Sequence, residues 1–393
     1  MRTKGKTGLD PLQKADLPTA VYPGGFRRVK GNSRKRILGS GQDSNSYHVM
    51  SRTAGGEMLF GDVEKEAFVR VMRRMERFSG VEVMTYAVMG NHFHLLVRVP
   101  NREQFVARFE GKAGEKRLMG HLGLLYSKGF VNALRGELAD LRKRGMNEEA
   151  ERLLEKFKGR FCELKTFVKE LKERFSRWYN KHHGRKGTLW MDRYKSVLVE
   201  DGEALRTMAC YIDLNPLRAG LCEDPKDYRW CGYAEAVAGS KRARRGLCRV
   251  MERALDSWNE KPVKKSKGSL TAAQWYRCWL FGDGIEVVAP GSGAGAAKLG
   301  KRSSVRSRKG ISARRVREVK AKGGVLSRAE LLRCRVRYFS DGVVIGSRSF
   351  VEGVFEEHRG KFGAKRKSGA RVIREAPEAG LFSLRDLRVQ AVE

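Results

Sequence analysis

The stretch MGNHFHLLV, residues 89–97, is the part of the chain that decides the fold prediction. In it, His92 and His94 alternate with Phe93 and Leu95. Because successive side chains of a strand point to opposite faces, this alternation predicts a strand whose two histidines share one face while the apolar residues enter a core on the other. Two imidazoles spaced in this way are able to bind one divalent metal, although a pair of structural or surface histidines is the alternative.

The segments around this stretch give a β-α-β-β pattern. Two strands, Val83–Val88 and His92–Val99, are joined by a short turn. Strand propensity begins upstream near Ser46, and apolar residues at helical spacing predict a helix over Asp62–Arg77 with Asp62 as its N-cap. This order is the first half of a split β-α-β fold of the ferredoxin-like type, so we expect an α+β protein.

A second informative stretch is YIDLNPLRAG, residues 211–220. A strand over Tyr194–Val199 precedes it, and a helix should run from Asp201, as N-cap, toward Asn215. Residues four apart lie on one helix face, so Tyr211 presents its phenol beside the Asn215 amide, whose oxygen is a candidate metal ligand. The alternatives are a core tyrosine and an asparagine that caps a following helix, because Pro216 either stops this helix or starts the next one.

The composition favours nucleic acid as the partner. The 393 residues include 81 Lys plus Arg against 45 Asp plus Glu, a formal net charge of +36. Such an excess repels itself unless a polyanion neutralises it, and phosphate binding releases counterions. A membrane is the weaker alternative, because no apolar run reaches the roughly 18 to 20 residues of a spanning helix and no signal peptide is evident. We expect a cytoplasmic protein, associated with the nucleoid if it is prokaryotic.

The seven cysteines form no Cys-x-x-Cys pair, which indicates neither a zinc finger nor a disulfide framework. Changes in composition divide the chain into four predicted parts. They are a basic N-terminal arm over 1–39, a main domain over 40–238 with a helical insertion at about 108–179, a basic and partly helical linker region over 239–326, and a small C-terminal module over 327–393. DNA binding is our hypothesis for the C-terminal module.

Several strings taken together resemble the REP-associated tyrosine transposases, which belong to the His-hydrophobe-His (HUH) superfamily of single-strand nucleases. In chain order they are YHV at 47–49, NHFHLL at 91–96, GTLW at 187–190, RYKS at 193–196, YI at 211–212, NP at 215–216, RAGL at 218–221 and DYRW at 227–230, followed by Tyr233. The resemblance covers roughly Ser46 to Ala234, about half of the chain. The long helical insertion and everything after about Gly239 are additions to the minimal family pattern.

The resemblance implies a ferredoxin-like HUH nuclease core, an antiparallel sheet with helices on one face, in the main domain. It implies that His92, His94 and Asn215 bind Mg²⁺ or Mn²⁺ and that Tyr211 is the catalytic nucleophile. The implied function is a DNA transposase and single-strand endonuclease that cleaves and rejoins hairpin DNA with flanking guide sequences through a 5′-phosphotyrosine. The alternative is a catalytically silent DNA- or RNA-binding regulatory protein on the same fold.

Candidate DNA contacts come from basic residues near these strings. They are His48, Arg52, Arg185, Lys186, Arg193, Lys195 and Arg218. For His48 we weigh phosphate contact or support of the site against a core histidine, and we expect the pair His182 and His183 to touch DNA rather than metal. The aromatic residues either stack on exposed bases or pack in the core; they are Trp178, Tyr179, Trp190 and Tyr194. The oligomeric state is not predicted.

Overall fold

The structure is a computed structural model, and it describes residues 44–256, 271–286, 309–334, 344–364, 366–372 and 382–384. The predicted N-terminal arm lies outside the described residues, as do parts of the predicted linker region and C-terminal module. No helix of the described ranges combines the length and apolar character that a membrane crossing requires.

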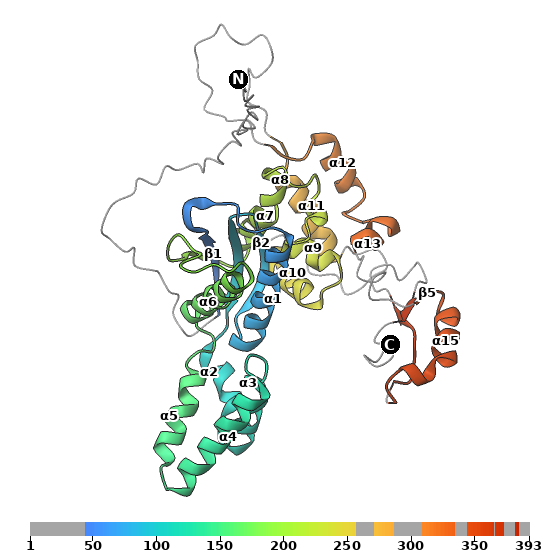
Figure 1. Cartoon of the computed structure of the whole chain (residues 1–393). Helices are drawn as coiled ribbons and strands as arrows, with labels where there is room; N and C mark the ends of the chain where they lie inside the picture. The colour runs from blue at the N-terminus through green and yellow to red at the C-terminus, as the bar shows by residue number, and fades with distance from the viewer. Residues whose placement is uncertain are drawn as a thin grey trace, which may run out of the picture. The chain divides into compact units, whose positions relative to one another are not determined.

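A four-stranded antiparallel sheet forms the centre of the main domain (Figure 1). Its strands are β1 (Asn45–Arg52), β2 (Glu82–Val88), β3 (His92–Val99) and β4 (Lys195–Val199), in the order β2-β3-β1-β4. Helix α1 (Asp62–Ser79) connects β1 to β2, and β3 lies between these two strands, as a split β-α-β unit requires. The chain is therefore an α+β protein.

Two predicted helix starts shift by a residue, for local reasons, and an alternative left open at Pro216 is settled. Helix α1 is capped by Gly61 instead of Asp62, whose carboxylate lies in the first turn, where the helix dipole favours it. Helix α7 (Glu203–Asp213) is capped by Gly202, because the Asp201 carboxylate accepts a hydrogen bond from Ser46 Oγ instead of capping the helix. Pro216 lies in the first turn of the short helix α8 (Asn215–Arg218), so it starts a new helix.

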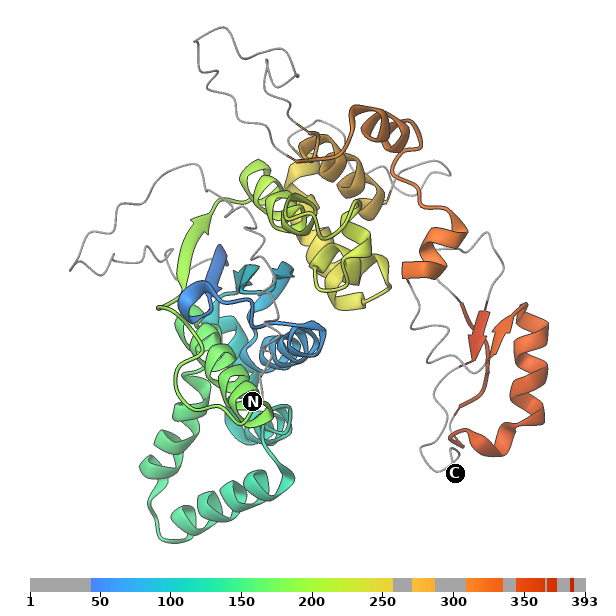
Figure 2. The same ribbon diagram turned by 45° about the horizontal axis from the view of Figure 1, so that its top comes forward.

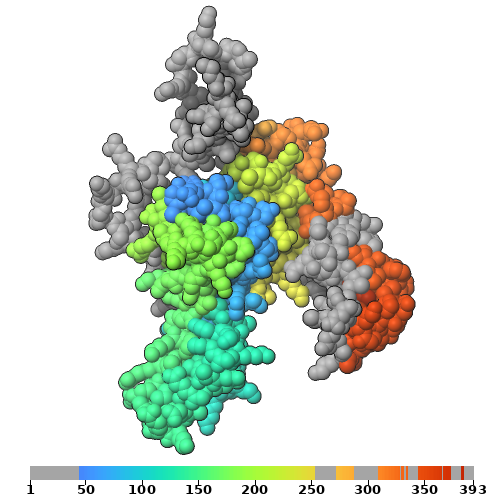
Figure 3. Space-filling view, in the orientation of Figure 1, coloured from blue at the N-terminus to red at the C-terminus, as the bar shows by residue number. Residues whose placement is uncertain are grey.

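One face of the sheet is covered by α1 and α6 (Leu164–His182), which lie side by side in blue and green in Figure 3. Phe93 and Leu95 of β3 enter this core, where the ring of Phe93 packs against Phe68 of α1 at 4.7 Å between centroids. Phe175 of α6 contacts the same Phe68 ring edge-on at 5.2 Å. Trp190, Tyr194 and Tyr179 are also buried among these residues, which favours the core-packing interpretation of these aromatics over base stacking.

Helices also cover the second face, which corrects the expectation of helices on one face only. Leu96 of β3 and Met84 of β2 enter a second core with α7, α10 (Lys241–Asp256) and α11 (Ala272–Asp283). The reason is the long extension after 239, whose apolar residues need a surface to cover. Further members of this core come from α12 (Ala313–Ala321) and α13 (Arg328–Cys334), so these described helices of the predicted linker region and module pack with the main domain.

The short helix α2 (Arg102–Val106) precedes the predicted insertion at about 108–179. The insertion folds as α3 (Gly111–Leu122), α4 (Lys128–Lys143), α5 (Asn147–Lys158) and most of α6 (Figure 2). Their apolar side chains extend the first core, among them Leu118, Leu134, Leu138, Leu154 and the following Phe161. Short elements complete the main domain: 3-10 helices at Ala54–Gly56, Ala107–Phe109 and Pro225–Asp227, and α9 (Gly232–Val237).

The C-terminal residues contain a small separate core. Strands β5 (Val344–Gly346), β6 (Arg371–Val372) and β7 (Phe382–Leu384) pair antiparallel in the order β5-β7-β6, with α15 (Arg348–Glu357) and a 3-10 helix at Arg359–Lys361. Val351, Phe355, Phe362 and Leu384 form its buried cluster.

Candidate active site

Three histidines gather on the second face of the sheet, where β1 and β3 pair. His94 lies opposite Met50 and His92 opposite Arg52, so His48 is the diagonal neighbour of His94. The His48 and His94 rings stack with centroids 5.2 Å apart, and His48 Nε2 lies 2.9 Å from His94 Nδ1. The His92 ring meets His94 edge-on at 5.1 Å. The structure thus brings together the two predicted ligands and His48.

Hydrogen bonds hold two of these rings with one nitrogen available. His92 Nδ1 donates to Asn91 Oδ1 at 2.6 Å, and Asn91 Nδ2 donates in turn to the carbonyl of Gly56 at 2.7 Å. These two successive hydrogen bonds fix the neutral His92 in the tautomer that has its proton on Nδ1 and leaves Nε2 unprotonated. Asn91 thus does for His92 what an outer-shell residue does for a metal ligand. The sequence analysis assigned no role to Asn91. Its position directly before His92 could have indicated that it supports this ligand.

His94 is the most constrained of the three. It is 0% exposed, and its Nε2 is buried without a hydrogen-bond partner among the described residues. In the tautomer in which His94 Nδ1 donates to His48 Nε2, the lone pair of His94 Nε2 is free to bind a metal ion or to accept a hydrogen bond. A buried polar atom without a partner is costly. A divalent metal satisfies such an atom, so the residues present fit the metal that the motif implies.

The electrostatics also favour neutral imidazoles. Burial lowers the pKa of His48 to about 4, and burial together with the nearby charge of Arg52 lowers the pKa of His92 to about 4. Burial, together with the neighbouring His92 and His48, also holds the pKa of His94 well below its ordinary value. Since a metal binds the neutral imidazole, these rings are ready to ligate near neutral pH without first losing a proton.

Tyr211 faces this cluster from α7. Its ring meets His94 edge-on at 5.9 Å and His48 edge-on at 6.3 Å between centroids. The Arg218 guanidinium of α8 lies 5.6 Å from the centre of the same ring. The arrangement places a phenol beside the candidate ligand His94 and beside His48, with a cation next to the phenol ring.

Asn215 does not take the capping position, which was one of its two sequence interpretations. It is the first residue of α8, and its Nδ2 donates to the carbonyls of Tyr211 at 2.9 Å and Ile212 at 3.4 Å, at the end of α7. It does not cap α8, whose N-cap is Leu214. Neither bond uses the amide oxygen, and its role as third metal ligand stays a prediction.

A buried carboxylate anchors the helix that carries Tyr211. Asp213 is 0% exposed and accepts hydrogen bonds from Thr85 Oγ1 at 2.8 Å, Tyr276 OH at 2.5 Å and the Tyr233 backbone at 3.2 Å. Burial raises the pKa of Asp213 to about 7, against the pull of these donors. The bonds tie α7 to β2, α9 and α11, so they fix the position of Tyr211. Asp213 stands between the two residues singled out from the sequence, yet nothing in the sequence showed its partners.

The basic residues predicted to contact DNA are spread over several elements. Arg52, Lys186, Arg193 and Lys195 are exposed, and Arg185 and Arg218 are half-buried. Lys195 lies on β4, the edge strand next to β1. DNA contact by these residues stays a prediction.

No family model matches the chain, and no curated protein matches it. A solved structure titled "Structure of the REP associates tyrosine transposase bound to a REP hairpin" is similar at 12% sequence identity and a TM-score of 0.33, over 53% of this chain and 86% of that chain. With a TM-score this low, the functional assignment has to come from the residues of the site.

Proposed function

We propose that the chain is a metal-dependent DNA transposase of the tyrosine type, with a ferredoxin-like HUH nuclease core, which cleaves and rejoins hairpin-forming single-stranded DNA. The observation that carries the proposal is the buried Nε2 of His94, which has no hydrogen-bond partner among the described residues. His92 lies beside His94, and Tyr211 meets the His94 ring from another element. A core histidine pair has no need of such an arrangement, because buried polar atoms are otherwise paired.

His92 and His94 would hold the metal, with Asn215 as the proposed third ligand and Mg²⁺ or Mn²⁺ as the proposed ion. When bound, the ion supplies Lewis acidity toward a non-bridging phosphate oxygen. His48 is bonded to His94 and therefore positions that ligand. Asn91 does the same for His92.

Tyr211 would attack the scissile phosphorus. Its phenol oxygen forms the new P–O bond as the phenol proton is lost, and the bond to the 3′ oxygen breaks, so that a 3′-hydroxyl leaves after taking up a proton. The product is a 5′-phosphotyrosine, which keeps the phosphodiester bond energy for rejoining by a 3′-hydroxyl. The Arg218 guanidinium beside the ring favours the negative charge that develops on the phenol oxygen.

The substrate side of the proposal rests on charge. A net charge of +36 gives affinity for the phosphate backbone of nucleic acid. The proposed contacts are the exposed residues Arg52, Lys186, Arg193 and Lys195. Hairpins with flanking guide sequences are the proposed single-stranded substrates.

The decisive experiment incubates the full chain with labelled hairpin DNA and Mn²⁺ and maps any covalent adduct by mass spectrometry. We expect an adduct on Tyr211 that is lost in Tyr211→Phe and on chelation, and that falls at least about a hundredfold in His92→Ala. Tyr126→Phe, in the helical insertion, is the matched control and should keep the adduct. An adduct that survives Tyr211→Phe would sink the proposal. Hairpin binding without any adduct, unchanged in every variant, would instead support the regulatory DNA-binding protein.

A further inference from the structure

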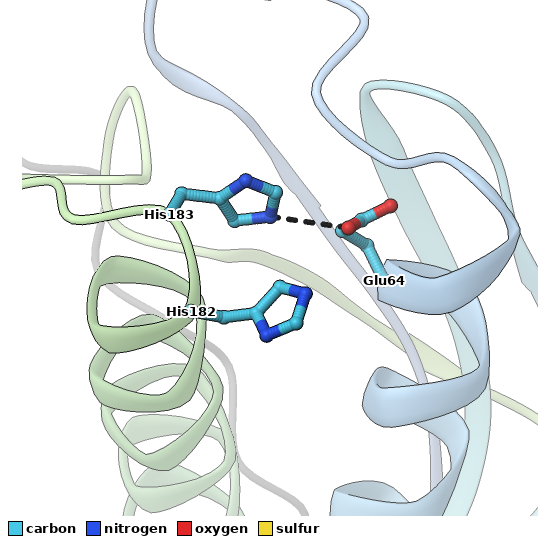
Figure 4. Close-up of side chains that lie close together, drawn as sticks. All are labelled: Glu64, His182 and His183. Atoms are coloured by element: carbon cyan, nitrogen blue, oxygen red, sulfur yellow. Dashed lines mark hydrogen bonds and ion pairs between the residues drawn. The ribbon is translucent and has the colours of Figure 1, made fainter.

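A second cluster of metal-ligating side chains lies away from the proposed active site. Glu64 in the first turn of α1, and His182 and His183 at the end of α6, each offer one ligand atom, and these atoms lie within 4.8 Å of one another (Figure 4). Helices α1 and α6 cover the sheet face that Phe93 enters, whereas His92 and His94 lie on the opposite face. The sheet therefore separates the two clusters.

The carboxylate of this cluster is held in an enclosed position. Glu64 is only 8% exposed, and its Oε1 lies 3.1 Å from His183 Nε2. A Cβ built on the preceding Gly61 would come within 2.9 Å of the other oxygen, Oε2, so the glycine leaves room for the carboxylate. The partner of the Glu64 carboxylate is thus an imidazole, a side chain that is itself a metal ligand.

The two imidazoles are held by aromatic neighbours on their own helix. The ring of His182 stacks on Trp178 at 5.1 Å with an interplanar angle of 11°, and the ring of His183 packs on Tyr179 at 4.3 Å. The two histidine rings meet edge-on at 5.0 Å. Figure 4 shows both rings extending from the end of α6 toward Glu64 on α1. Such packing limits the rotamers and prepares the rings for a shared ligand.

We propose that Glu64, His182 and His183 form a Zn²⁺ site that ties the end of α6 to the start of α1. Two imidazoles and one carboxylate are a zinc ligand set, with a fourth position left for water. Nitrogen donors favour zinc over Mg²⁺ or Mn²⁺. Tetrahedral bonds of about 2.0–2.1 Å place donor atoms roughly 3.3 Å apart, so small rotations of the exposed histidine side chains close the present cluster onto an ion.

The site has a local consequence for the loop that follows α6. Residues 184–187 begin directly after the two histidines and carry Arg185 and Lys186. The residues that follow this segment are fixed to the chain directly after β1, since the Ala54 amide donates to the Leu189 carbonyl at 2.9 Å and Thr53 pairs with Trp190. At the near end the Arg185 amide donates to the Asn180 carbonyl at 2.8 Å, and zinc would add a second attachment there.

The test measures zinc binding to the full chain carrying His92→Ala, which removes the contribution of the proposed active site and makes the result independent of the proposed function. Calorimetry with ZnCl₂ should show one ion bound to this variant. The visible absorption spectrum of the Co²⁺ form should show that the ion is tetrahedrally coordinated. His182→Ala, His183→Ala and Glu64→Gln should each weaken this binding at least about tenfold, since even outer-shell changes cost that much. His358→Ala, an exposed histidine of the C-terminal residues, is the control and should bind as before.

A second readout follows the loop itself. In the His92→Ala chain, zinc should slow tryptic cleavage after Arg185 and Lys186 severalfold. In the double variant that also carries His183→Ala, zinc should leave the cleavage rate unchanged. Binding that persists undiminished in the His182, His183 and Glu64 variants would overturn the proposal. So would the absence of a bound ion in the His92→Ala chain, which would leave the His183–Glu64 contact as an ordinary ion pair.

Discussion

The two faces of the four-stranded sheet carry different kinds of residues. Toward α1 and α6 the strands present Phe93, Leu95 and their apolar neighbours, which pack ring against ring. Toward α7 the same strands present His48, His92 and His94, and β2 contributes Thr85 to a buried carboxylate. The first face is held together by apolar burial, whereas the second combines an apolar core of its own with polar groups that need specific partners. A single strand therefore encodes the fold and the proposed chemistry in alternate residues.

The largest expected effect separates the two faces within one strand. Phe93→Ala empties part of a fully buried aromatic cluster and should lower the free energy of unfolding by about 4 kcal/mol. His92→Ala, the adjacent residue on the other face, should change the metal-free stability by no more than about 1 kcal/mol because it is only half-buried. Urea denaturation in the presence of chelator measures both. Equal losses would show that the second face also depends on its histidines for folding.

A second prediction concerns the polar groups of the second face. Asp224 accepts from Arg277 at 2.6 Å and from Lys226 at 2.8 Å, and all three side chains are buried. Asp224→Asn leaves the buried Arg277 short of its counter-charge, whereas Lys226 keeps Asp227 and Glu330 as partners, and the substitution should cost about 3 kcal/mol. Asp227→Asn is the control, because that exposed carboxylate also pairs with Lys226 and should cost less than about 1 kcal/mol.

The same carboxylate predicts a pH dependence. Burial alone would raise the pKa of Asp224, but Arg277 and Lys226 hold it below its ordinary value. A lowered pKa adds stability above the unfolded value of about 3.9, and this contribution is lost as the pH falls below it. The stability difference between the wild type and Asp224→Asn should thus stay constant from pH 5 to 8 and shrink below about pH 4. A difference that instead grows in acid would contradict the charge assignment.

The sequence predicted the apolar face better than the polar one. Alternation at Phe93 and Leu95 placed the strand and its core face within a residue, because burial follows a local period. The histidine face was predicted from the same period. The partners of those histidines were not, since His48 and Asn91 reach them through strand pairing and a turn. Local patterns do not report contacts between distant residues.

The region after 239 shows the same limit. Its basic composition indicated a linker, yet Leu247, Tyr276 and Val316 are buried against α7 and the sheet. In α10 and α12 the apolar residues are separated by many arginines. The apolar face of each helix is recognised only from the surface that the helix covers in the structure. Asp213 was missed for a related reason, because two of its partners, Tyr233 and Tyr276, lie 20 and 63 residues away.

The smallest predicted effect tests whether the buried carboxylate and its donors act as a unit on the polar face. Thr85→Val preserves shape but removes the hydrogen bond to Asp213, and it should cost about 1–2 kcal/mol. Thr207→Val, at an exposed position of α7, should stay within about 0.5 kcal/mol of the wild type.

A double-mutant cycle with Asp213→Asn completes this test. If Thr85 and Asp213 stabilise α7 through their shared bond, Thr85→Val should cost about 1 kcal/mol less once Asp213 is already replaced. Fully additive losses would mean that Thr85 contributes only by packing against Gly232, where a Cβ would approach its Oγ1 within 2.2 Å. In that case the polar face would resemble the apolar one, with shape rather than hydrogen bonding fixing the helix that carries Tyr211.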